Sequence, residues 1–113
     1  MYGLLNLNRP VSRTSKLDLD DVLKTKRALM KLNLYKVPDY GLNEFSDEPM
    51  FAGIETFQKR NGLQIDGVVN PDGETAEALD RTLRRKGVGA ATLAAPLAPP
   101  PRTGPIPIGL DAE

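Results

Sequence analysis

Apolar residues recur at intervals of three and four positions in three stretches of the chain, and turn-forming residues separate these stretches. That period predicts three amphipathic helices, each with one face in a core. The first predicted helix starts between Asp18 and Asp21 and ends at Leu32 or Asn33, the second follows Ser46 and ends at about Gln58, and the third spans Glu74 to Lys86. The side chains expected to face the core are Val22, Thr25, Leu29, Leu32, Met50, Phe51, Ile54, Phe57, Ala76, Leu79 and Leu83.

Residues typical of helix ends and turns flank these stretches. Ser46 is a good N-cap for the second helix, because its side-chain oxygen can accept a hydrogen bond from an unpaired backbone N–H group. Gly62 and Gly87 are expected to stop the second and third helices, since glycine adopts the left-handed conformation at little cost. Asp66-Gly67 predicts a turn that leads the chain towards the third helix.

Two side-chain groups leave alternatives open. Leu23 and Met30 lie beside the core stripe of the first helix, where they either widen that stripe or form a patch for a partner. Basic residues gather in the last turns of the third helix, and they indicate either a solvated helix end or an anion site. The basic residues are Arg81, Arg84, Arg85 and Lys86.

Three short motifs follow one another at the end of the second helix and in the loop after it. They are Phe57-Gln58, Gly62-Leu63 and Asp66-Gly67-Val68. In this order they resemble the small three-helix peptidoglycan-binding domain of bacterial and phage cell-wall proteins. The resemblance covers residues 22–83 and implies an all-α fold, with a compact three-helix domain over residues 19–86. A weak internal repeat supports it, because each half consists of a turn that leads into an amphipathic helix.

The chain departs from this family pattern in its first two helices and in both turns. In the helices, Thr25-Lys26 stands where the family commonly has Leu-Gln, and Met50 stands where a capping Thr is usual. Residues 43–49 lengthen the first turn, and residues 70–73 replace a shorter link in the second. Both loops that would edge a ligand groove are therefore altered.

The segments outside the three helices, residues 1–18 and 87–113, are predicted to be extended arms. The first has no sustained period, and the second holds six of the ten prolines, which oppose helix formation and favour polyproline II geometry. The proline-rich tail is either a disordered linker or a segment that docks on a partner. The residues expected to dock are Leu4, Leu5, Leu7, Pro99, Pro100, Pro101, Ile106 and Ile108.

The composition excludes several classes of function. The chain has no Cys and no His, so disulfides, a Cys nucleophile, a Ser-His pair and an ordinary zinc site are excluded, and no metal or cofactor is expected. Fifteen basic and 15 acidic residues leave no net charge to attract nucleic acid. No apolar run approaches the ~20 residues of a membrane-spanning helix, and the first residues lack the basic start of a signal peptide. Neither membrane insertion nor a signal peptide is expected.

Binding is expected in preference to catalysis. A glycan hydrolase needs two carboxylates across a cleft, whereas the acidic residues beside a loop, Glu44, Asp47 and Glu48, serve better as caps of the second helix. The resemblance implies a shallow groove that holds the peptide or glycan of the wall. The positions that match this groove are Tyr35, Tyr40, Gln58, Gln64, Asp66 and Val69. Gln58 and Asp66 have a structural alternative, since both side chains can bond to the backbone of the loop.

The sequence leads to the hypothesis of a non-catalytic module that binds peptidoglycan. We expect this module to belong to a phage-like or gene-transfer-agent-like particle, where both tails contact other particle or cell-envelope proteins. Extended arms suit such an assembly because they bury much surface per residue. The expected location is the virion or the bacterial cell envelope. Two alternatives stay open: an assembly adaptor that has the fold without wall binding, and the wall-targeting part of a cell-wall hydrolase.

Overall fold

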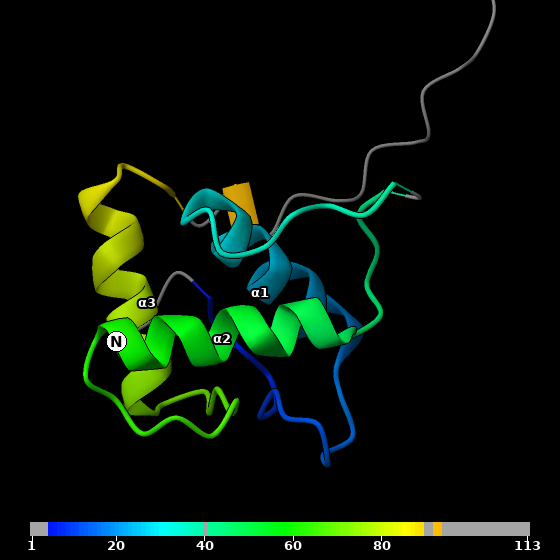
Figure 1. Cartoon of the computed structure of the whole chain (residues 1–113), viewed down its shortest axis with the longest axis horizontal. Coiled ribbons are helices and arrows are strands. Elements are labelled where there is room, and N and C mark those ends of the chain that lie inside the picture. The colour runs from blue at the N-terminus through cyan, green and yellow to red at the C-terminus, as the bar shows by residue number, and fades with distance from the viewer. Residues whose placement is uncertain (1–4, 40, 90–91, 94–113) are drawn as a thin grey trace, which may run out of the picture.

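The structure, a computed structural model, describes residues 5–39, 41–89 and 92–93, and it confirms the predicted all-α fold. The named helices are α1 (Leu19–Lys31), α2 (Glu48–Arg60) and α3 (Glu74–Arg85). Helix α1 contacts both α2 and α3. Figure 1 shows α2 crossing in front of α1, and α3 lies beside one end of α2 in this view. The described part of the chain has no strand beyond one isolated pair of bridged residues.

The first two helices begin at aspartate caps. Asp18 accepts a hydrogen bond from the N–H group of Asp21 at 3.0 Å, and Asp47 accepts one from the N–H group of Met50 at 2.9 Å. The prediction that Ser46 caps α2 was therefore wrong by one residue. The carboxylate of Asp47 also accepts a 2.7 Å hydrogen bond from the hydroxyl of Tyr35, and this second contact holds Asp47 at the cap position.

All three helices end in the same way, at a residue with a positive φ angle. Asn33 (φ 61°), Gly62 (φ 68°) and Gly87 (φ 77°) occupy this position. The N–H group of the next residue then bonds to a carbonyl five positions back, which is the hydrogen bond of a Schellman motif. These bonds join Leu34 to Leu29 at 2.8 Å, Leu63 to Gln58 at 2.9 Å and Val88 to Leu83 at 3.0 Å. The apolar residue after each cap packs against the edge of the core.

The faces predicted from helical spacing form the core. Among the predicted residues only Leu32 is partly buried, and the others are at most 4% exposed. Leu23 is 8% exposed and Met30 packs partly buried against the core, so the interpretation that they widen the core stripe is confirmed.

The N-terminal arm also lies in this core, which corrects one prediction. Leu5, Leu7 and Val11 are 1%, 8% and 0% exposed and pack with the apolar residues of the helices. Leu5 and Leu7 are thus buried within the chain itself and do not form a surface for a partner. The physical reason is the small core of three short helices, which gains apolar area when the arm covers it. Leu4 lies outside the described residues.

Hydrogen bonds attach the arm to the domain at two places. Val11 and Val69 form an antiparallel bridge with N–H to carbonyl distances of 2.8 and 2.9 Å. The carboxylate of Asp21, which is fully buried, accepts the N–H groups of Asn8 and Arg9 at 2.8–3.0 Å. Burial raises the pKa of Asp21, and the two N–H groups oppose this shift because they stabilise the carboxylate.

On the C-terminal side, residues beyond α3 also pack on the domain. Val88 lies against the core, and Leu93 is fully buried while its carbonyl accepts a 3.2 Å hydrogen bond from Arg27. The five tail residues predicted to dock, Pro99, Pro100, Pro101, Ile106 and Ile108, lie outside the described part of the chain.

Gly53 allows α2 to approach the chain that leaves α1. A Cβ atom at this position would lie 2.5 Å from the carbonyl oxygen of Leu34 and 3.2 Å from a methyl group of Leu29. We expect Gly53→Ala to lower the free energy of unfolding by about 1–3 kcal/mol, because the backbone must move to admit the methyl group. Urea unfolding followed by circular dichroism measures this loss. Ala52→Ser, at the exposed neighbouring position, is the control, and equal stability of both variants would contradict the packing.

The burial of the arm gives a second stability prediction. Leu5→Ala should lower the free energy of unfolding by about 2–4 kcal/mol, since it removes fully buried methyl groups and leaves a cavity. Leu19→Ala changes a side chain that is 50% exposed and should cost less than about 1 kcal/mol. If Leu5→Ala unfolds at the same urea concentration as the wild type, the arm does not belong to the core.

Candidate functional site

The six positions that match the family's groove do not share one surface. Tyr35, Gln58 and Val69 are buried, with exposed fractions of 7%, 1% and 0%. Gln64 and Asp66 have exposed side chains in the loop after α2, whereas Tyr40 lies outside the described residues. A ligand on this loop therefore has access to the side chains of Gln64 and Asp66, but three of the expected contacts are covered.

Gln58 uses its amide group to hold the loop that leads to α3. Its Oε1 accepts the N–H groups of Asp66 and Gly67 at 3.1 and 3.0 Å. Its Nε2 lies within hydrogen-bonding distance of the carboxylate of Asp66, the carbonyl of Val68 and the hydroxyl of Thr75, at 2.8–3.2 Å. The buried amide thus finds all its hydrogen-bond partners within the chain. This agrees with the alternative in which Gln58 supports the loop and does not contact a ligand.

Asp66 stabilises the turn after α2 by bonding to the backbone of the loop, which was the alternative to a ligand contact. Its Oδ1 accepts the N–H group of Val68 at 3.0 Å in addition to the amide of Gln58. An aspartate that accepts an N–H group two residues further on forms an Asx turn. The exposed side of the carboxylate remains accessible from water.

Lys26 is a buried polar residue beside the site, although it is not one of the six positions that match the family's groove. It is 1% exposed, and its ammonium group donates to the carbonyl and side chain of Asn43 at 3.1 and 3.0 Å and to the carbonyl of Phe45. Asp47 lies 3.6 Å from the same ammonium group and neutralises it. In the sequence, the only indication of a special role for Lys26 was that Thr25-Lys26 replaces the Leu-Gln pair of the family pattern. Lys26 thereby fixes the loop before α2, much as Gln58 fixes the loop before α3.

A groove of about 360 Å³ lies between the arm, the start of α1 and the loop before α2. We call it the arm groove. Apolar and polar side chains share its walls, and two of its members, Leu19 and Phe45, are large apolar residues with 50% and 61% of their surface exposed. The lining residues are Arg13, Ser15, Leu17, Leu19, Val22, Glu44, Phe45 and Ser46.

The one basic residue of the arm groove is paired with carboxylates of α2. Arg13 contacts Glu48 at 3.0 Å and Glu55 at 2.8 Å, and its guanidinium lies 4.9 Å from the ring centre of Phe51. The hydrogen bonds to Glu48 and Glu55 raise the pKa of Arg13, and the bond from Arg13 lowers the pKa of Glu48. The positive charge of Arg13 is therefore balanced before any ligand arrives.

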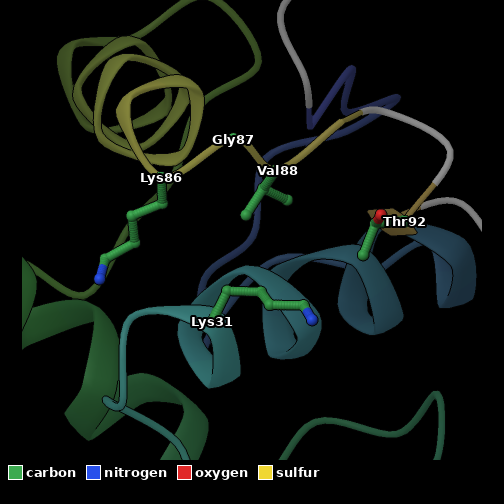
Figure 2. Close-up of a pocket in the computed structure, with 5 residues that line it drawn as sticks. All are labelled: Lys31, Lys86, Gly87, Val88 and Thr92. Atoms are coloured by element: carbon green, nitrogen blue, oxygen red, sulfur yellow. The ribbon is translucent and has the colours of Figure 1, made fainter.

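A second cavity of about 450 Å³ lies between the ends of α1 and α3. Its walls are formed by Lys31, Lys86, Gly87, Val88 and Thr92 (Figure 2). In Figure 2 the side chains of Lys31 and Lys86 extend in different directions and do not converge on one point. Of the basic cluster at the end of α3, only Lys86 lines this cavity. The side chains of all four members, Arg81, Arg84, Arg85 and Lys86, are exposed, which favours the interpretation as a solvated helix end over an anion site.

The described residues contain no group of three or more acidic side chains that could hold a metal ion. None of the described helices is long and apolar enough to cross a membrane.

Comparison with known families gives one match. The model of a family described as "Putative peptidoglycan binding domain" matches residues 18–79, which is more than half of the 113-residue chain. The match includes helices α1 and α2, the two loops that follow them and the first half of α3. Comparisons with curated proteins and with solved structures gave no match.

The amide network of Gln58 gives a prediction that separates support of the loop from ligand contact. Gln58→Ala should lower the free energy of unfolding by about 1–3 kcal/mol, because it leaves N–H groups of the loop without partners. Amide hydrogen exchange at Gly67 should accelerate in this variant. Gln64→Ala, an exposed change in the same loop, is the control and should leave both quantities unchanged. Unaltered exchange at Gly67 in Gln58→Ala would contradict the supporting role.

Proposed function

Because this chain belongs to the peptidoglycan-binding domain family, we propose that it is a non-catalytic module that binds the peptidoglycan of the bacterial cell wall. The family match over residues 18–79 is the observation that carries the proposal. The fold is consistent with it, since the three helices and their turns stand in the order that the motifs require. Association with the cell wall or envelope follows from the same match.

The arrangement of carboxylates supports a binding role without catalysis. Hydrolysis of a glycan requires an acid and a second carboxylate on opposite sides of the bond. Glu44 is the one carboxylate among the residues that line the two cavities described above. Asp47 is occupied as the cap of α2, and Glu48 is paired with Arg13. These positions leave no pair of carboxylates across either cavity.

We propose further that the module is a structural component of a phage-like or gene-transfer-agent-like particle. The composition of the C-terminal segment supports this placement, since six prolines in residues 87–113 favour an extended chain that can lie along a neighbouring protein. The N-terminal arm is used within the domain, so anchoring falls to the C-terminal segment. The alternatives are an assembly adaptor without wall binding and the wall-targeting part of a cell-wall hydrolase.

The proposal predicts that the full chain sediments with purified insoluble peptidoglycan. We expect most of the protein in the pellet at micromolar concentration, and little of it with insoluble cellulose as the control polymer. Release of soluble wall fragments should not increase during the incubation, because the module is proposed to be non-catalytic. A chain that is folded by circular dichroism yet stays in the supernatant would exclude wall binding and favour the adaptor. Release of fragments would exclude the non-catalytic role.

A further inference from the structure

We propose that the arm groove is the site at which this domain binds the glycan strand of peptidoglycan, with Phe45 stacked on an N-acetylated sugar. The inference rests on the proposed function and adds to it a place and a ligand class. Most of the groove's lining comes from the arm, with Arg13, Ser15 and Leu17, and from the loop before α2, with Glu44, Phe45 and Ser46. The site thus differs from the six positions that the resemblance implied.

Phe45 is an exposed aromatic side chain on a backbone that is fixed from both sides. Its N–H group donates to the side chain of Asn43 at 3.0 Å, and its carbonyl accepts from the buried ammonium group of Lys26. The side chain nevertheless keeps 61% of its surface in contact with water. An exposed aromatic ring on an ordered backbone does not gain the free energy that burial would give it. Exposed apolar side chains of this kind are typical of surfaces that contact a partner or ligand.

The walls of the arm groove offer what the two sides of a sugar ring require. Leu17, which is partly buried, and Leu19, which is 50% exposed, provide apolar surface beside Phe45 for the C–H face of a sugar and for an N-acetyl methyl group. Glu44 and Ser46 line the same groove, and neither makes a side-chain hydrogen bond to the described residues. Their oxygens can therefore pair with sugar hydroxyl and amide groups.

The charge of the groove favours the glycan over the peptide of the wall. Its one cation, Arg13, is balanced by Glu48 and Glu55, and the remaining charge on the lining is the carboxylate of Glu44. A peptide that carries carboxylates meets no unbalanced positive charge here and is repelled by Glu44. A neutral N-acetylated sugar has no such penalty, so the geometry points to the glycan.

The chain offers a matched control for Phe45. Ile65 is also a large apolar residue in a loop next to α2, and it is 55% exposed. It lines neither of the two cavities described above. Replacement of Phe45 or Ile65 by Ala removes an exposed apolar side chain in each case, and neither change should unfold the domain.

The test is an NMR titration of the full ¹⁵N-labelled chain with a tetramer of β-1,4-linked N-acetylglucosamine, which is neutral and carries no peptide. We expect saturable shifts at the amides of Leu19, Phe45 and Ser46. Phe45→Ala should weaken binding about tenfold, the effect of losing one aromatic contact, whereas Ile65→Ala should bind as the wild type does. A dilution series without sugar shows whether self-association moves the same amides.

Each remaining outcome overturns the inference. Shifts confined to the loop after α2, or equal affinities of Phe45→Ala and Ile65→Ala, would place the glycan site elsewhere. Stronger shifts with a synthetic wall peptide than with the sugar would reverse the ligand class, and shifts on dilution alone would make the groove an interface between copies. Sedimentation of Phe45→Ala with insoluble peptidoglycan separates the two proposals. If it sediments fully, wall binding stands and the groove inference fails; if the wild type does not sediment, the proposed function fails.

Discussion

The loops of this domain depend on two buried polar side chains that project from the helices. Lys26 donates to carbonyl groups of the loop before α2, and Gln58 bonds to N–H and carbonyl groups of the loop before α3. A connection without regular secondary structure leaves backbone groups that must find partners elsewhere. The helices supply those partners, so the loops are ordered without strands. The surface that a ligand can reach is consequently set by residues that a ligand cannot touch.

The arm shows a second constraint, which is the small size of the core. Three helices of 12 or 13 residues bury limited apolar area, and domains of this size are only marginally stable. Leu5, Leu7 and Val11 enlarge the core from outside the segment that matches the family. Asp21 of α1 binds backbone N–H groups of the arm. Arg13 of the arm pairs with two carboxylates of α2. The same attachment creates the arm groove.

Helical periodicity was sufficient to predict the three helices and the faces that they turn to the core, because both depend on local spacing. It could not place the arm, since a segment without a period shows no preferred face. The sequence offered both Ser46 and Asp47 as caps of α2 and could not choose between them, because the hydroxyl of Tyr35 that holds Asp47 comes from a distant turn. For the candidate site, the sequence indicated support of the loop backbone as one of two roles for Gln58 and Asp66, but it showed neither the burial of Gln58 nor its hydrogen bond to Asp66. No sequence pattern indicated Phe45 as a site residue, because the position of its backbone is fixed by a hydrogen bond from Lys26, which is distant in sequence.

The bridge between Val11 and Val69 has a consequence for the order in which the chain folds. The partners are far apart in sequence, and the N–H group of Leu5 bonds to Asp80 across an even longer separation. Contacts of this kind form late, because the cost of closing the loop must be met before they stabilise anything. During synthesis the arm leaves the ribosome before Val69 and α3 do. Asp21 can bind the backbone of Asn8 and Arg9 early, because these residues are close in sequence, whereas Leu5 is expected to dock last and to stay in water until α3 has formed.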